Sequence, residues 1–376
     1  MRAVFFLVLT SGLFITLPAP FAELYWSYVH NCGTSQIHIN RKEGIPRMDS
    51  EIKRVLMQYF PSHLRASIID FLSSLSHLAH QKDAALEEIR VRVNSPLMVL
   101  INHITHKLEM VPGKKDIEKM IHLISDNSLY SYQEEIVKGF ITISGGHRVG
   151  VVGKVHMKNG QIKSLKDISG INVRFSREVI GAANHIATKV CLGQRGIIGN
   201  TLIVGPPGCG KTTLLRDLAR IYSNGELGLK PHNVSIIDER SELAGSVKGI
   251  PQKQVGIRTD VMDSCPKAIG IMMVIRSMSP DLIVTDEIGR AEDVKAVWES
   301  VHAGVKLLLS AHGESMEALR KRPGFQQLID HGVFDRVVIL SRKNGPGTVD
   351  ELIKTEDSNK KTDYQRLRLS PRRDRK

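Results

Sequence analysis

Cysteine is scarce in this 376-residue sequence, which contains only Cys32, Cys191, Cys209 and Cys265. No two of these residues form a C-x-x-C pair, which argues against a zinc knuckle. Four cysteines are also too few for a disulfide scaffold in a chain of this length. We therefore expect reduced thiols and a cytoplasmic location.

Aromatic and acidic residues are also in short supply. Only 5% of the residues are aromatic, and 39 acidic residues stand against 52 lysines and arginines, giving a net charge of +13. Much of this excess lies in residues 359–376, which hold eight basic residues and two acidic ones. Such a tail either attracts phosphates, nucleic acid or anionic lipid, or is simply solvated. The remaining composition, 41% hydrophobic and 24% charged, is that of an ordinary globular protein and excludes a collagen-like or polytopic membrane protein.

Two patterns of secondary structure divide most of the chain. Residues 48–185 mix helix signals with alternating, β-branched segments, which predicts an α+β N-terminal domain. Residues 186–353 alternate short apolar strands with helices, which predicts an α/β domain with a mainly parallel sheet. An apolar leader at 1–47 and a basic tail at 354–376, expected to be disordered, complete the chain. Predicted helices lie at 49–80 (broken by Pro61), 114–125, 132–138 and 181–192, and predicted strands lie within 86–101 and 139–164 and at 201–204, 234–238, 281–287, 306–312 and 336–340.

The segment GPPGCGKTT at residues 205–213 fits the phosphate-loop pattern G-x-x-x-x-G-K-[ST]. It follows an apolar strand and precedes a helix, as that pattern requires. Its glycines allow backbone N–H groups to curl around phosphate oxygens, and the helix N-terminus adds a partial positive charge. We expect Lys211 to reach the β- and γ-phosphates of ATP and the Thr212 hydroxyl to bind Mg²⁺. The predicted nucleotide-binding residues are Gly205, Pro206, Pro207, Gly208, Cys209, Gly210, Lys211, Thr212 and Thr213.

Acidic residues follow a second apolar strand, in the sequence SPDLIVTDEIG. The carboxyl end of a parallel strand lies in the same crevice as the nucleotide in an α/β sheet. Asp286 is therefore expected to hold Mg²⁺, and Glu287 to activate the attacking water as a general base. Another strand ends in Glu239 and Glu242, which either face the same site or belong to a charged surface loop. His312 ends a further strand, where it is placed to sense the γ-phosphate.

The leader contains an uncharged stretch from Ala3 to Ala22 that follows Arg2. It has the pattern of a secretory signal and is also just long enough to span a bilayer. Both interpretations conflict with a nucleotide site, because nucleotide is found inside the cell. A third interpretation is that Met48 is the true initiator and that residues 1–47 are an over-extended start. The sequence leaves these three alternatives open.

The order of phosphate loop, Asp-Glu strand and His-ended strand resembles the secretion ATPases of type II and type IV systems. The resemblance is closer to one branch, the stage III sporulation protein AA family of endospore-forming bacteria, and extends from about residue 48 to about residue 353. The segments that carry it are 145–155, 171–183, 205–220, 235–246, 256–267, 277–289 and 307–313.

This resemblance implies a RecA-like ATPase that forms a homo-hexameric ring with nucleotide between subunits. It places Glu239 and Glu242 in an acidic box and His312 on the second histidine of a histidine box, whose first position here is Val305. It also implies that arginines of the N-terminal domain act on the transferred phosphate, and Arg174 matches that location best. The other candidates are Arg148, Arg258 and Arg276.

Three functions follow as alternatives. The first is a Mg²⁺-dependent ATPase motor that energises a channel complex of sporulation stage III A proteins. The motor would be peripheral at the inner membrane, on the mother-cell side. This location and these partners are implied by the resemblance alone. The second is a nucleic-acid-binding ATPase, against which the low aromatic content argues. The third is a scaffold that binds nucleotide with little turnover, against which Lys211 and Glu287 argue.

Overall fold

The computed structural model describes residues 5–8, 14–17, 50–76, 86–126, 132–137, 139–192, 197–322, 324–355 and 364–367. The chain divides into two units, Met1–Arg47 and Met48–Lys376. In the first unit, strands β1 (Phe5–Val8) and β2 (Phe14–Leu17) pair antiparallel. No helix in the described ranges is both long enough and apolar enough to cross a membrane.

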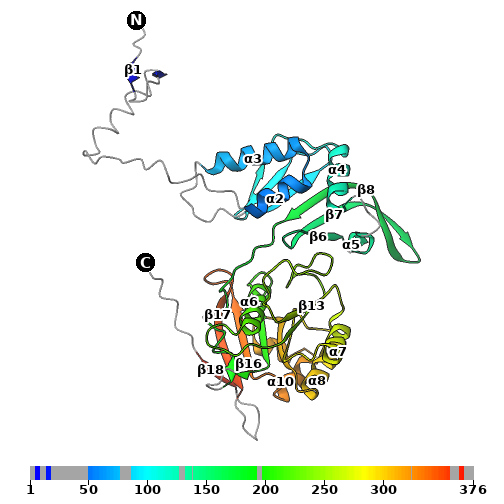
Figure 1. Cartoon of the computed structure of the whole chain (residues 1–376), viewed down its shortest axis with the longest axis vertical. Helices are drawn as coiled ribbons and strands as arrows, with labels where there is room; N and C mark the ends of the chain where they lie inside the picture. Colours follow the sequence, from blue (N-terminus) through cyan, green and yellow to red (C-terminus); the bar gives the residue numbers. More distant parts are fainter. Residues whose placement is uncertain are drawn as a thin grey trace. The chain divides into compact units, whose positions relative to one another are not determined.

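Helices and an antiparallel sheet form the N-terminal part of the second unit (Figure 1). The predicted helix at 49–80 is split by Pro61 into α2 (Ser50–Tyr59) and α3 (Ser62–Ser76), because proline lacks the N–H that would continue the helix. Six strands form one antiparallel sheet in the order β5-β4-β3-β8-β7-β6. They are β3 (Leu86–Arg92), β4 (Met98–Ile101), β5 (Ile104–Lys107), β6 (Phe140–Ile143), β7 (His147–Lys158) and β8 (Gln161–Arg174), with helices α4 (Lys114–Ile124) and α5 (Gln133–Val137).

The apolar residues of this sheet and its helices form one core. Ile89, Val99, Ile141, Val149 and Val173 are fully buried there. In β3 and in the first half of β7, buried positions alternate with exposed or half-buried ones, as expected for an antiparallel sheet with one covered face.

The C-terminal part is built on an eight-stranded sheet in the order β13-β12-β14-β15-β11-β16-β17-β18. The six strands from β13 to β16 are parallel, and β17 and β18 are antiparallel, so the predicted mainly parallel sheet is confirmed. The strands are β11 (Thr201–Gly205), β12 (Val234–Asp238), β13 (Thr259–Asp263), β14 (Leu282–Thr285), β15 (Lys306–His312), β16 (Arg336–Ser341), β17 (Thr348–Thr355) and β18 (Tyr364–Leu367). The helices are α6 (Lys211–Asn224), α7 (Lys267–Ser277), α8 (Ala291–His302), α9 (Met316–Arg320) and α10 (Phe325–Asp330).

Both faces of this sheet are buried. Ile203 and Val338 belong to the core that includes α6, whereas Leu202 and Val337 belong to the core that includes α8 and α10. Because neighbouring residues of a strand point to opposite faces, a strand covered on both sides has to be apolar at every position. This explains the continuous apolar runs in the sequence.

One prediction of secondary structure was wrong. Residues 181–192 form turns that end in β9 (Cys191–Leu192), which pairs with β10 (Ile197–Ile198), instead of a helix. The carboxylate of buried Asp217 accepts hydrogen bonds from the N–H groups of Gly181 and Ala183, at 3.1 and 2.7 Å, which hold the start of this segment. The later N–H groups bond three or four residues back without forming a continuous helix. Within the basic tail, β18 pairs antiparallel with β17, and the prediction of disorder for the rest of the tail falls on residues 356–363 and 368–376, which lie outside the described residues.

Candidate functional site

The phosphate-loop segment connects β11 directly to α6. Gly210 is the residue that caps the N-terminus of α6, with φ of 95° and without a side-chain cap, so the first N–H groups of the helix are left for another acceptor. Gly208 also has a positive φ, of 67°. A Cβ atom at Gly210 would lie 2.8 Å from the backbone nitrogen of Gly347, and one at Gly208 would lie 2.5 Å from the guanidinium of Arg342. Only glycine fits these two positions, and the resulting curved backbone suits a phosphate group.

Lys211 and Thr212 begin α6 and point to different partners. The buried Lys211 ammonium donates to the carbonyl oxygens of Gly205 and Pro206, at 3.0 and 3.1 Å. The Thr212 hydroxyl donates to Oδ2 of Asp286 at 2.5 Å, across from α6 to the end of β14. Asp286 also accepts a hydrogen bond from the Ser310 hydroxyl of β15. A hydroxyl and a carboxylate in contact are ligands that suit Mg²⁺, so the residues present fit this ion.

Glu287 adopts an unusual backbone conformation directly after β14. Its φ is 51°, in the left-handed region that non-glycine residues rarely occupy. The Ser310 hydroxyl accepts a hydrogen bond from the Glu287 N–H at 2.9 Å, which helps to hold this conformation. The Glu287 carboxylate is 45% exposed, and its Oε2 lies 3.4 Å from Nη1 of Arg240. Backbone strain of this kind is concentrated at functional sites.

The predicted acidic residues meet in one small pocket. Strands β12 and β14 are parallel neighbours, so their carboxyl ends lie at the same edge of the sheet. The pocket is lined there by Ile237, Asp238, Glu239, Arg240, Glu242, Lys267, Asp286 and Glu287. The structure thus brings Glu239, Glu242, Asp286 and Glu287 together, and the Thr212–Asp286 contact joins the phosphate loop to them.

Basic residues hold the two glutamates that follow β12. Glu239 pairs with Lys267 and lies 3.8 Å from Arg290. Burial opposes ionisation of Glu239, but the hydrogen bond and charge of Lys267 outweigh it, and the pKa of this carboxyl is held below its ordinary value. Glu242 accepts a hydrogen bond from Arg148 of β7 at 2.5 Å. The same guanidinium donates to the carbonyl of Arg240, which connects the six-stranded sheet to this loop.

Asp238 organises the loop instead of facing solvent. It is almost fully buried and accepts hydrogen bonds from the N–H groups of Glu242 and Ala244, both at 2.8 Å. Burial raises the pKa of this carboxyl. Buried Arg216 of α6 supports the same loop by donating to the carbonyl oxygens of Leu243 and Glu242, at 2.5 and 2.7 Å. Arg216 was not predicted as a site residue; the signal for it was a charged residue four positions after Thr212 on a helix that begins at the phosphate loop.

His312 ends β15 next to the phosphate loop. Its register partner on β11 is Gly205, the first residue of the loop, and its side chain is exposed. That His312 senses the γ-phosphate stays a prediction.

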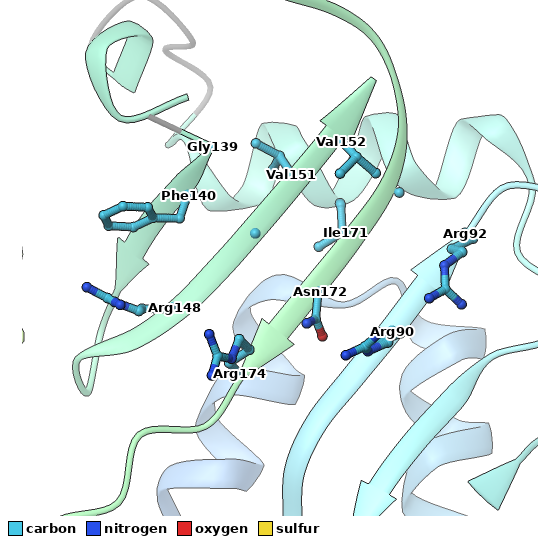
Figure 2. Close-up of a pocket in the computed structure, with 12 residues that line it drawn as sticks. Arg90, Arg92, Gly139, Phe140, Arg148, Val151, Val152, Ile171, Asn172 and Arg174 are labelled. Carbon is cyan, nitrogen blue, oxygen red and sulfur yellow. The ribbon is translucent and has the colours of Figure 1, made fainter. Parts of the chain in front are cut away.

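Arg174 lies in a different environment from the acidic pocket. Its Nε is 3.2 Å from Glu88, and 60% of its side chain is exposed. Figure 2 shows Arg174 with Arg90, Arg92 and Arg148 around a cavity of about 420 Å³ on the six-stranded sheet. Of the arginines considered from the sequence, Arg148 is the one that the structure places on the acidic loop, whereas Arg174 contacts the N-terminal sheet.

The importance of Arg240 and Lys267 was not evident from the sequence, because their partners are distant along the chain.

Comparisons with known proteins agree with this architecture. The stage III sporulation protein AA of Bacillus subtilis is 45% identical over 280 residues, which cover 74% of this chain and 90% of that protein. An uncharacterized protein, ycf45, of Porphyra purpurea is 30% identical over 195 residues, and these cover 51% of this chain and 33% of that protein. The X-ray structure of the Yersinia pseudotuberculosis ATPase DotB matches with a TM-score of 0.51 at 14% identity, covering 79% of this chain and 80% of that one.

The likeness to DotB supports the fold, a P-loop domain with a mainly parallel sheet preceded by a smaller domain with an antiparallel sheet. The model of the family described as "Sporulation stage III, protein AA" matches residues 65–359, which include both sheets up to β17. With this match and the identity to the Bacillus protein, the chain belongs to the sporulation stage III protein AA family.

Proposed function

We propose that this protein hydrolyses ATP in a Mg²⁺-dependent reaction at the site formed by the phosphate loop and the acidic pocket at the ends of β12 and β14. The observation that carries the proposal is the 2.5 Å contact between Thr212 and Asp286. It joins a glycine-rich loop suited to phosphate with a carboxylate suited to a metal ion. Glu287, the proposed general base, lines the same pocket as Asp286.

The phosphate loop, Thr212, Asp286 and Glu287 have distinct parts in this proposal. The N–H groups at the start of α6 and the Lys211 ammonium hold the β- and γ-phosphates. Thr212 and Asp286 hold Mg²⁺, which when bound neutralises charge on the phosphates. Glu287 accepts a proton from the attacking water. Because Arg240 lies 3.4 Å from the Glu287 carboxylate, Glu287 has to turn away from Arg240 to act as a base.

The proposal extends to a motor on the basis of family membership. The protein forms a homo-hexameric ring, with Arg174 exposed for contact with nucleotide held by a neighbouring copy. The hydrogen bond from Arg148 to Glu242 links the N-terminal sheet to the acidic loop, and it provides a route by which hydrolysis moves one part against the other. We propose that the ring energises a membrane-spanning sporulation channel of stage III A proteins.

Replacement of Asp286 by Asn is expected to lower ATP turnover about a hundredfold and to raise the Mg²⁺ concentration needed for half-maximal activity. The amide removes the negative charge that attracts the ion, while the volume of the side chain is kept. A Mg²⁺ titration of phosphate release measures both effects. The matched control is Asp281→Asn, at the opposite end of β14, where the carboxylate accepts the N–H of Asn233 at 2.8 Å. An unchanged Mg²⁺ requirement in the Asp286 variant would remove Asp286 from the metal site.

The pair Arg148–Glu242 is expected to couple energetically. Both side chains are partly exposed, at 20% and 34%, so the interaction is worth about 1 kcal/mol in a double-mutant cycle. Arg148→Ala, Glu242→Gln and the double variant are compared by urea unfolding followed by fluorescence. A cycle between Glu242→Gln and Arg177→Ala, an exposed arginine near the end of β8, serves as the control. Strictly additive effects of the first two substitutions would show that this contact does not link the two parts.

A second candidate, a nucleic-acid-dependent ATPase, is favoured by the arginine-lined cavity of the N-terminal sheet. Arg90, Arg92, Arg148 and Arg174 supply positive charge there, and the Arg148 guanidinium lies 4.6 Å from the centre of the Phe140 ring. Stimulation of phosphate release by single-stranded DNA, with a steep salt dependence, would favour this candidate over the motor. Loss of that stimulation on deletion of residues 359–376 would assign the contacts to the basic tail.

A further inference from the structure

Strands β7 and β8 extend beyond the rest of their sheet as a two-stranded ribbon (Figure 1). β6 pairs with β7 only as far as Gly150, and β3 pairs with β8 only from Gly170 onward. The two strands continue to pair with each other as far as Lys158 and Gln161. Within the described part of the chain, residues 154–166 therefore have no further strand on either edge.

The register gives the ribbon one apolar face. Val155 lies opposite Leu165, and Met157 lies opposite Ile162. Residues directly opposite each other in an antiparallel pair share a face. The register shifts by one residue at Lys163, between these two pairs, and this shift returns Ile162 to the face of Leu165, so the four side chains form one apolar patch. Leu165 packs partly against the N-terminal core, but Val155, Met157 and Ile162 are 44%, 53% and 41% exposed. Apolar side chains are therefore presented to the surroundings at the end of the ribbon.

The opposite face of the ribbon is basic. Lys154 lies opposite Lys166, His156 opposite Ser164, and Lys158 opposite Gln161. Residues 154–166 contain four lysines and no acidic residue. The ribbon is thus amphipathic, with lysines on the face opposite its apolar patch.

We propose that this ribbon binds the surface of an anionic lipid bilayer. Val155, Met157 and Ile162 enter the boundary between headgroups and acyl chains, and the lysines interact with the negative headgroups. Three exposed apolar side chains form a patch far smaller than the area that a stable protein–protein interface buries, which argues against a protein occupant. Residues 154–166 of the ribbon contain no Phe, Tyr or Trp on which bases could stack, which argues against nucleic acid.

The first test measures co-sedimentation of the full chain with vesicles of phosphatidylcholine, with and without phosphatidylglycerol. The double variant Lys154→Glu/Lys158→Glu is expected to lower the partition into anionic vesicles by at least about tenfold. The triple variant Val155→Ser/Met157→Ser/Ile162→Ser is expected to lower it by a similar factor. The matched control is Ile104→Ser/Lys107→Glu on β5, which is an edge strand of the same sheet and does not pair with β7 or β8. Ile104 is 62% exposed there. This control is expected to bind as the unmodified protein does.

A second measurement shows whether the ribbon itself enters the bilayer. Its result does not depend on whether residues 1–47 also bind the vesicles. Tryptophan is introduced by Met157→Trp and, as a control, by Ile104→Trp, and quenching by brominated phosphatidylglycerol vesicles is compared with that of the unmodified protein. We expect tryptophan at position 157 to add a strongly quenched component and tryptophan at 104 to add none. Equal quenching at the two positions would overturn the proposal, even if the protein binds the vesicles.

Other outcomes would assign the ribbon to a different occupant. If the lysine variant binds anionic vesicles normally and instead loses binding to single-stranded DNA, the lipid proposal is wrong and a nucleic-acid contact replaces it. Phosphate release in the absence of vesicles is expected to be the same in all ribbon variants, which separates this proposal from the proposed hydrolysis. Circular dichroism of each variant shows that a loss of vesicle binding does not come from misfolding.

Discussion

Glu287→Gln is expected to lower ATP hydrolysis by about two to four orders of magnitude and to leave ATP binding intact. The amide has the size of the carboxylate but is not able to accept a proton from water. Glu287 follows Asp286 in the pocket and is held there by the bond from its N–H to Ser310, so the substitution leaves the backbone contacts unchanged. The neutral amide also attracts Arg240 less strongly than the carboxylate does, which leaves the charge of this guanidinium less neutralised. We therefore expect ATP, which is an anion, to bind at least as tightly as before. Single-turnover hydrolysis and equilibrium binding of a fluorescent ATP analogue separate the two effects.

The control for this variant is Glu292→Gln, an exposed acidic residue in the first turn of α8. It is expected to hydrolyse ATP at the rate of the unmodified protein. If Glu287→Gln retained full hydrolysis, another group would have to act as the base, and Glu239 and Glu242 would be the next candidates in the same pocket.

Lys211→Ala is expected to weaken ATP binding by about tenfold to a hundredfold. As a consequence, turnover is expected to be lost at ordinary ATP concentrations. Hydrogen bonds to charged groups contribute about 1.5–3 kcal/mol each, which corresponds to this range. Lys211 is buried at the start of α6, where its ammonium reaches the carbonyl oxygens of Gly205 and Pro206. The ammonium therefore lies beside the loop backbone that is proposed to surround the phosphates.

Isothermal titration with ATP measures this loss, and Lys295→Ala, an exposed lysine of α8, is the control. The far-ultraviolet circular dichroism of the Lys211 variant is expected to remain unchanged, because its removal leaves the strand and helix bonds in place. ATP binding of unaltered affinity in a folded Lys211 variant would place the nucleotide outside the phosphate loop.

Much of the parallel sheet was predictable because burial on both faces leaves a simple signal. The apolar runs at 234–238 and 306–312 coincide with β12 and β15. β13 gave no such signal, because only two of its five residues, Val261 and Met262, are apolar and the strand lies at the edge of the sheet. The helix predicted at 181–192 failed for another reason: the segment forms a series of turns, and its first N–H groups bond to the carboxylate of Asp217, which is distant in sequence.

The neighbourhood of the phosphate loop and the acidic residues was also predictable. Parallel strands place their carboxyl ends at one edge, so a loop after β11 and acids after β12 and β14 have to lie close together. The basic partners of those acids could not be predicted in the same way. Arg148 reaches Glu242 from a different sheet, and the pairing of Arg240 with Glu287 depends on loop conformations that no periodic pattern encodes.

A structure of the protein with ADP, Mg²⁺ and a fluoroaluminate mimic of the transferred phosphate tests the proposed site as a whole. We predict that the phosphates lie against residues 205–213, that Thr212 and Asp286 bind the metal ion, and that the Glu287 carboxylate turns from Arg240 toward the mimic. Nucleotide bound elsewhere in the chain, or a metal ion held without Thr212 and Asp286, would show that the site is assigned wrongly.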